Sequence, residues 1–76
     1  MTVHLRAFAR YRELLGFSEL DLPLPEPPSL ARLLEDPRLA ALPGNALLAV
    51  NQAFAAPDAP LAEGDEVALM PPVSGG

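Results

Sequence analysis

The chain has 76 residues, half of them hydrophobic and a fifth charged, which is the composition of one small globular domain. Its formal net charge is −5 and its five basic residues are scattered arginines, so binding to a nucleic-acid backbone is not expected. The lack of cysteine excludes disulfides, zinc–thiolate sites and a thiolate nucleophile, and no apolar run approaches the ~20 residues of a membrane span.

The N-terminal part of the sequence predicts a strand, a short helix and a second strand. Residues 2–9 alternate between apolar and other positions, which indicates a strand with one buried face and Phe8 on the opposite face. The positions expected to be buried are Val3, Leu5, Ala7 and Ala9. Residues 10–15 favour a short helix ended by Gly16, and residues 17–24 form the second strand of a hairpin. No signal peptide is visible before the first strand, so we expect a cytoplasmic protein.

The central part of the sequence predicts a rigid connection followed by the main helix. Four prolines within residues 23–28 favour an extended connection. Ser29 is suited to cap a helix, and Asp36 before Pro37 is expected to interrupt it before a further turn over residues 37–42. The apolar face of this helix consists of Leu30, Leu33 and Leu34.

Three further strands are predicted in the C-terminal half. Residues 46–50 form a buried strand, Asn51 and Gln52 a turn, residues 53–55 a short strand and residues 66–70 the last strand. Along the last strand, one face carries Val67 and Leu69 and the other carries Ala68 and Met70.

This order of elements predicts an α+β fold, in which one main helix packs on one face of a mixed sheet of about five strands. The first and last strands are expected to be neighbours, and the uncovered face of the sheet is left to solvent or to a partner. Residues 1–70 are predicted to form the domain, and residues 71–76 an extended C-terminal tail. Pro71 and Pro72 end the last strand because neither can donate a backbone hydrogen bond.

The tail has the sequence PPVSGG, and it presents the α-carboxylate of Gly76. The two prolines favour a stiff, extended backbone, while Gly75 and Gly76 lack a Cβ and can pass through a narrow channel. The carboxylate is ionised at neutral pH and can attack the α-phosphate of ATP. This attack gives an acyl adenylate, which is an electrophile. Sulfide delivered by another protein would displace AMP from it and leave a thiocarboxylate at Gly76, which explains how a chain without cysteine can carry sulfur. A terminal pair of glycines is also common in flexible ends, where it has no function.

The chain resembles the small subunits of molybdopterin synthase, which are ubiquitin-like sulfur carriers with the β-grasp fold. The resemblance covers nearly the whole chain and is weakest over residues 23–44. It is carried by residues 8–16 (FARYRELLG) and by several stretches between Leu48 and Gly76. These stretches are AVNQ at 49–52, PL at 60–61, EGDEVA at 63–68 and, most specific, the closing PPVSGG.

The resemblance implies a cycle with three kinds of protein partner. An ATP-dependent activating enzyme adenylates Gly76, a sulfur donor protein supplies the sulfur, and the large synthase subunit receives the tail. The sulfur then enters the dithiolene of molybdopterin, made from cyclic pyranopterin monophosphate. The chain is therefore expected to be no enzyme on its own and to hold no cofactor or metal. Residues 66–76 contain no basic side chain, so the large subunit must provide the cationic pocket for the anionic pterin.

A docking surface is predicted on the uncovered face of the sheet. Phe8 and Met70 lie on that face near the tail-bearing end, and Phe54 joins them from the short strand. Family members also carry large apolar residues at these positions, with an aromatic expected where this chain has Met70. A strand register shifted by one residue would place the same side chains in the core instead. The partner-binding residues implied by the resemblance are Phe8, Arg12, Phe54, Met70, Pro71, Pro72, Val73 and Ser74.

Several residues and functions have competing interpretations. Arg12 lies either at the rim of the docking surface or on an exposed helix face, and His4 is expected to be a surface histidine rather than a metal ligand or base. Glu63, Asp65 and Glu66 form either an acidic corner for a basic partner or a solvated turn. The alternative functions are a sulfur carrier of the same fold for thiamine or tRNA thiolation, and a ubiquitin-like binding module without sulfur chemistry.

Overall fold

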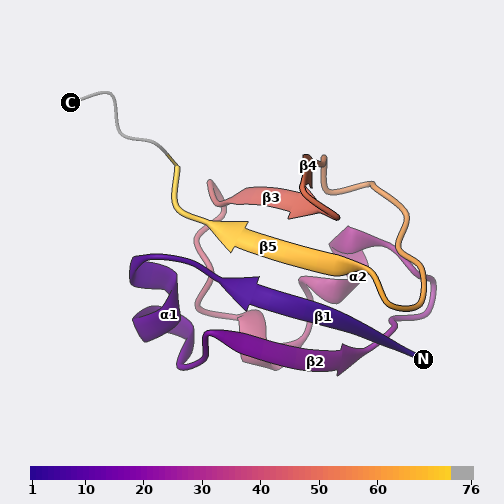
Figure 1. The fold of residues 1–76 in the computed structure, drawn as a ribbon, viewed down its shortest axis with the longest axis horizontal. Coiled ribbons are helices and arrows are strands. Elements are labelled where there is room, and N and C mark those ends of the chain that lie inside the picture. Colours follow the sequence, from indigo (N-terminus) through magenta and orange to yellow (C-terminus); the bar gives the residue numbers. More distant parts are fainter. Residues whose placement is uncertain (73–76) are drawn as a thin grey trace.

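The computed structural model describes residues 1–72 and contains one mixed sheet with short helices on one side (Figure 1). The strand order is β2-β1-β5-β3-β4, in which β1 and β5 are parallel and all other neighbours are antiparallel. This is the five-stranded β-grasp sheet that the sequence predicts, with the first and last strands side by side. The elements are β1 (Thr2–Ala7), α1 (Arg10–Leu15), β2 (Glu19–Pro23), α2 (Leu30–Leu33), the 3-10 turn η1 (Pro37–Leu39), β3 (Leu47–Val50), β4 (Ala53–Phe54) and β5 (Glu66–Met70).

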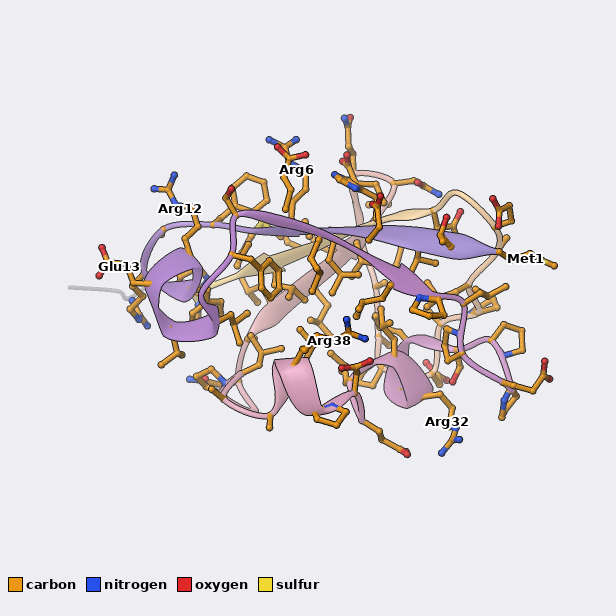
Figure 2. All side chains as sticks on the ribbon, turned by 90° about the horizontal axis from the view of Figure 1, so that it is seen from below. Met1, Arg6, Arg12, Glu13, Arg32 and Arg38 are labelled. Carbon is orange, nitrogen blue, oxygen red and sulfur yellow. The ribbon has the colours of Figure 1, made fainter. Side chains whose placement is uncertain are left out.

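The hydrophobic core lies between the sheet and the layer of α2 and η1, which Figure 2 shows on one side of the sheet. In β5, Val67 and Leu69 are 0% exposed, whereas the alternate residues Ala68 and Met70 are only half-buried. The strand register predicted from the alternation is therefore correct. The helical layer and α1 contribute the buried side chains of Tyr11, Leu30, Leu33 and Leu39.

The first strand is shorter than predicted and leads into α1. β1 ends at Ala7, and Ala9 is exposed rather than buried, because the backbone leaves the extended conformation there and Ala9 has a positive φ of 53°. Gly16 ends α1 with φ 84°, and its N–H donates to the carbonyl of Arg12 at 3.0 Å. The predicted helix with a glycine terminator is confirmed.

The main helix begins as predicted but is only one turn long. The Ser29 hydroxyl accepts a hydrogen bond from the Arg32 N–H at 3.2 Å, which caps the start of α2. Asp36 has extended backbone angles because the residue before a proline avoids helical geometry, and its carboxylate caps η1 by accepting from the Arg38 N–H at 2.9 Å. Within residues 1–72, no helix has the length and apolar character needed to cross a membrane.

The turn between β3 and β4 has a left-handed backbone at both central residues. Asn51 has φ 51° and Gln52 has φ 71°. Asn51 is held from three sides: its N–H donates to the Glu66 carbonyl at 2.8 Å, its Nδ2 donates to Asp65 Oδ1 at 2.9 Å, and its Oδ1 accepts from the Glu66 N–H at 3.0 Å. Asn tolerates this conformation, whereas Gln does not favour it.

Replacing Gln52 by glycine is expected to stabilise the protein. Gln52→Gly gives the Asn-Gly pair preferred in this type of turn, and relief of the left-handed conformation outweighs the entropy of the added glycine. The left-handed conformation costs about 1–2 kcal/mol and the entropy of glycine about 0.5–1 kcal/mol, so the expected gain in the free energy of unfolding is about 0.5–1 kcal/mol. Urea denaturation measures this gain, and Gln52→Ala, which keeps the strain, serves as the control. A loss of stability in Gln52→Gly would contradict the explanation.

Candidate functional site

A shallow hollow of about 270 Å³ occupies the face of the sheet opposite the helices. One row of directly paired residues runs across four strands beneath it, because Arg6 pairs with Ala68, Ala68 with Ala49, and Ala49 with Phe54. Residues paired in this way point to the same face of a sheet. The two alanines leave space between larger neighbours, which explains the hollow. Its lining consists of Arg6, Phe8, Ala49, Gln52, Phe54, Glu66, Ala68 and Met70.

The three apolar side chains predicted to form a docking surface lie together around this hollow. Phe54 is 77% exposed and Phe8 is 36% exposed, while Met70 is half-buried. None of the three belongs to the buried core, so the alternative with a shifted strand register is wrong. The parallel strands β1 and β5 end at the same end of the sheet (Figure 1). Ala7 pairs with Leu69 there, so residue 8 follows beside residue 70. An exposed apolar group of this kind is typical of a protein interface. Contact with a partner stays a prediction.

Arg6 is a residue of this site that the sequence analysis did not select. Its guanidinium carbon lies 5.2 Å from the centre of the Phe8 ring, in a cation–π contact. Such a contact orients the exposed ring and places a positive charge at the rim of the hollow. The alternation of residues 2–9 already placed Arg6 and Phe8 on one face of the strand, and this was the signal that could have found it.

Arg12 and the start of the tail lie outside the lining of the hollow. The exposed Arg12 donates from Nε to the Ala9 carbonyl at 3.4 Å, and Figure 2 shows it on the same side of the sheet as Arg6. Pro71 and Pro72 follow β5 directly and are half-buried, and β5 ends before them as predicted. The remaining predicted residues, Val73, Ser74, Gly75 and Gly76, lie outside the described residues, so the division into domain and tail stays a prediction.

His4 lies on the same open face, between two carboxylates of β2. Its Nδ1 is 2.6 Å from Asp21 Oδ1 and its Nε2 is 2.9 Å from Glu19 Oε1. These hydrogen bonds, to Asp21 first and then to Glu19, raise the pKa of His4 above its usual value of 6.5. His4 is thus a paired surface histidine, as predicted, and no group of three or more potential metal-ligating side chains occurs in the described part of the chain.

The pairing of His4 predicts a stability that falls as the pH rises. Because the pKa of His4 is raised on folding, its contribution is fully present below pH 6.5 and is lost as the pH rises through the higher, folded-state pKa. The side chain is 35% exposed, so solvent screening limits the effect to about 0.2–1 kcal/mol. Chemical denaturation of His4→Gln and wild type on both sides of this range measures it. A deficit in His4→Gln that is as large at high pH as at low pH would contradict the assignment.

The acidic residues near β5 are engaged within the chain. Asp65 accepts hydrogen bonds from Asn51 Nδ2 at 2.9 Å and from the Ala62 N–H at 2.8 Å. Glu63 Oε1 accepts from the Thr2 N–H at 2.7 Å. These bonds favour the interpretation of residues 63–65 as a structural turn, whereas Glu66 lines the hollow beside the apolar residues.

Comparison with known proteins identifies the family of this chain. The model of the ThiS family matches residues 5–76, which include the second half of β1 and the whole of β2, β3, β4 and β5. The chain belongs to the ThiS family. Family membership agrees with the β-grasp sheet and with the resemblance stated from the sequence.

Individual relatives of this ThiS family chain are sulfur carrier subunits. It is 41% identical over 75 residues to the molybdopterin synthase sulfur carrier subunit of Escherichia coli (strain K12), and the match covers 91% of this chain and 93% of that protein. Among solved structures, it superposes with a TM-score of 0.84 and 29% identity on a putative molybdopterin converting factor, subunit 1, from Pyrococcus furiosus, covering 96% of this chain and 99% of that one. The chain also matches one chain in the structure of a complex of subunits 1 and 2 of molybdopterin-converting factor from Helicobacter pylori. This match has a TM-score of 0.69 and 26% identity, and it covers 100% of this chain and 100% of that one.

Proposed function

We propose that this chain is the sulfur carrier subunit of a molybdopterin synthase, with the α-carboxylate of Gly76 as the group that carries sulfur. The observation that supports this most is the ThiS family match over residues 5–76, together with the relatedness to sulfur carrier subunits. On its own the chain is not an enzyme; it is the sulfur-donating partner in a heteromeric sulfurtransferase.

The chemistry requires two changes at one carbon atom. The Gly76 carboxylate attacks the α-phosphate of ATP in the active site of an activating enzyme, which forms an acyl adenylate and releases pyrophosphate. Hydrosulfide, delivered through a sulfur donor protein, then displaces AMP and leaves a thiocarboxylate. In the synthase, the sulfur passes to cyclic pyranopterin monophosphate and water restores the carboxylate. The dithiolene contains two sulfur atoms, so two loaded carriers serve each product molecule.

The structure supports a division of labour between this chain and a large subunit. The exposed Phe8 and Phe54 and the half-buried Met70 surround the hollow near the end of β5, from which the chain continues into residues 71–76. A partner that covers this face would receive the tail at the same time. The absence of basic side chains from residues 66–76 leaves the binding of the anionic pterin to that partner.

Intact-mass analysis tests the carrier chemistry directly. The purified chain is incubated with an activating enzyme, ATP and a sulfur source, and the expected product has gained the mass of one sulfur in place of one oxygen at Gly76. Omission of ATP is the control and should leave the mass unchanged. No mass gain with an activating enzyme that loads another carrier under the same conditions would favour a ubiquitin-like binding module.

The acceptor of the sulfur is tested separately. A carrier for thiamine or tRNA thiolation would show the same mass gain, since it shares the Gly76 chemistry. Co-purification with a molybdopterin synthase large subunit supports our proposal, whereas co-purification with a thiazole synthase favours the thiamine alternative. Location in the cytoplasm stays a prediction.

A further inference from the structure

A second and larger hollow lies at the other side of Phe54. This groove of about 550 Å³ runs between the helical layer and the outer edge of β3 and β4. β4 pairs only with Ala49 and Val50 of β3, so the beginning of β3 is not covered by a neighbouring strand on this side. The lining of the groove includes Leu34, Leu39, Leu47, Phe54, Ala55 and Pro57.

Phe54 connects this groove to the hollow on the open face of the sheet. Its side chain lines both depressions and is 77% exposed, so it stands as a ridge between them. A partner that contacts Phe54 from the open face therefore lies next to the groove. An exposed aromatic residue with the apolar groove on one side, and Phe8 and Met70 in the hollow on the other, is the arrangement expected around an interface anchor.

The chemistry of the groove indicates what it binds. None of the eleven residues that line it is charged, although a fifth of the chain is charged and its net charge is −5. Interface centres are depleted in charge in the same way. An apolar segment fits this lining, whereas a basic peptide attracted by the acidic chain would find no counter-charge there.

We propose that the groove takes an apolar segment of the molybdopterin synthase large subunit, which extends over Phe54 from the open face of the sheet. This inference rests on the proposed function and adds a second contact region to it. Phe54 then divides the surface that binds the large subunit into two parts, the hollow on the open face and the groove. The sequence predicted only the part on the open face.

Gly44 offers a way to test the groove without disturbing the core. It lines the groove, it is exposed, and a Cβ built on it meets no atom within 4 Å. Gly44→Glu and Gly44→Lys place opposite charges at the rim, and Gly44→Ala is the matched control. Because either charge must be desolvated by an apolar segment, both charged variants are expected to raise the Kd for the large subunit of the same organism about tenfold. The alanine variant adds only an uncharged methyl group and is expected to raise this Kd far less than either charged variant.

The experiment separates this inference from the proposed function. Isothermal titration gives the affinities, and thiocarboxylate formation and thermal unfolding are measured on the same variants. If both charged variants bind like wild type while Phe54→Asp still weakens binding, the groove inference is overturned and the proposed function stands. If Gly44→Glu and Gly44→Lys change the Kd in opposite directions, the inference is also overturned, because this result would indicate a charged contact. If the charged variants bind the large subunit like wild type but the isolated chain sediments differently, the groove contacts a second copy of the chain instead.

Discussion

Deletion of Gly76 is expected to abolish sulfur loading and leave the fold intact. The core side chains of the described residues extend no further than Leu69, so the free energy of unfolding should not change. Loading depends instead on where the carboxylate lies in the activating enzyme. Removing one residue, or adding one after Gly76, moves that carboxylate by about 3.3–3.6 Å along an extended chain. Misplacement by about 1 Å can already cost about 10²-fold in rate, so both variants should fall below detection.

The control for this experiment is Gly76→Ala, which keeps the length of the tail and adds one methyl group. A partial loss in Gly76→Ala beside a complete loss in the deletion would show that position matters more than the width of the channel. Intact mass after incubation with the activating enzyme, ATP and a sulfur source reports loading, and urea denaturation reports the fold. Normal loading of the shortened or the lengthened chain would refute the role of Gly76.

A charge on the open face is expected to weaken binding to the large subunit far more than it lowers stability. Phe54→Asp replaces a side chain that is 77% exposed in the free chain, so its contribution to folding is small. In a complex, the carboxylate would be desolvated at the centre of an apolar contact, and the expected loss is at least about 2 kcal/mol of binding free energy. Phe8→Asp and Met70→Asp are expected to act in the same direction, with a larger effect on folding because these side chains are less exposed.

Leu14→Asp is the matched control for these substitutions. Leu14 is an apolar residue of α1 that is 48% exposed, and it does not line the hollow. Its variant carries the same added charge and should bind the large subunit like wild type. Titration calorimetry measures the affinities and thermal unfolding the stabilities. If Phe54→Asp loses its fold, or if Leu14→Asp binds as weakly as Phe54→Asp, the open face is not the docking surface.

The sequence predicted the sheet better than the helices because the two signals differ in kind. Alternation in residues 66–70 distinguishes buried from exposed positions without knowledge of the neighbouring strands, and the observed burial of Val67 and Leu69 follows it. The length of α2 depends instead on how the chain around Pro37 packs below the sheet. The leucine pattern correctly predicted the buried face of this helix, but α-helical structure in this segment is limited to residues 30–33.

The site could be predicted only as separate residues. Phe8, Phe54 and Met70 were each placed on the open face from local patterns. The hollow between them depends on the row of Arg6, Ala68, Ala49 and Phe54, and therefore on the registers of four strands. A single sequence does not specify these registers, because pairing partners far apart in the chain have no local signal. The same reason explains why the bonds from Asn51 to Asp65 and Glu66 were not foreseen.

The parallel pairing of β1 and β5 has a practical consequence for measuring these interactions. It places Met1 at the opposite end of the sheet from the exit of β5 at residue 70 (Figure 1). The sequence contains no lysine, so an amine-reactive dye directed at the α-amino group of Met1 does not also label side chains of this sequence. A fluorophore or a sensor-chip linker introduced there would leave the hollow, the groove and the exit of the tail accessible, with a single defined attachment point per molecule.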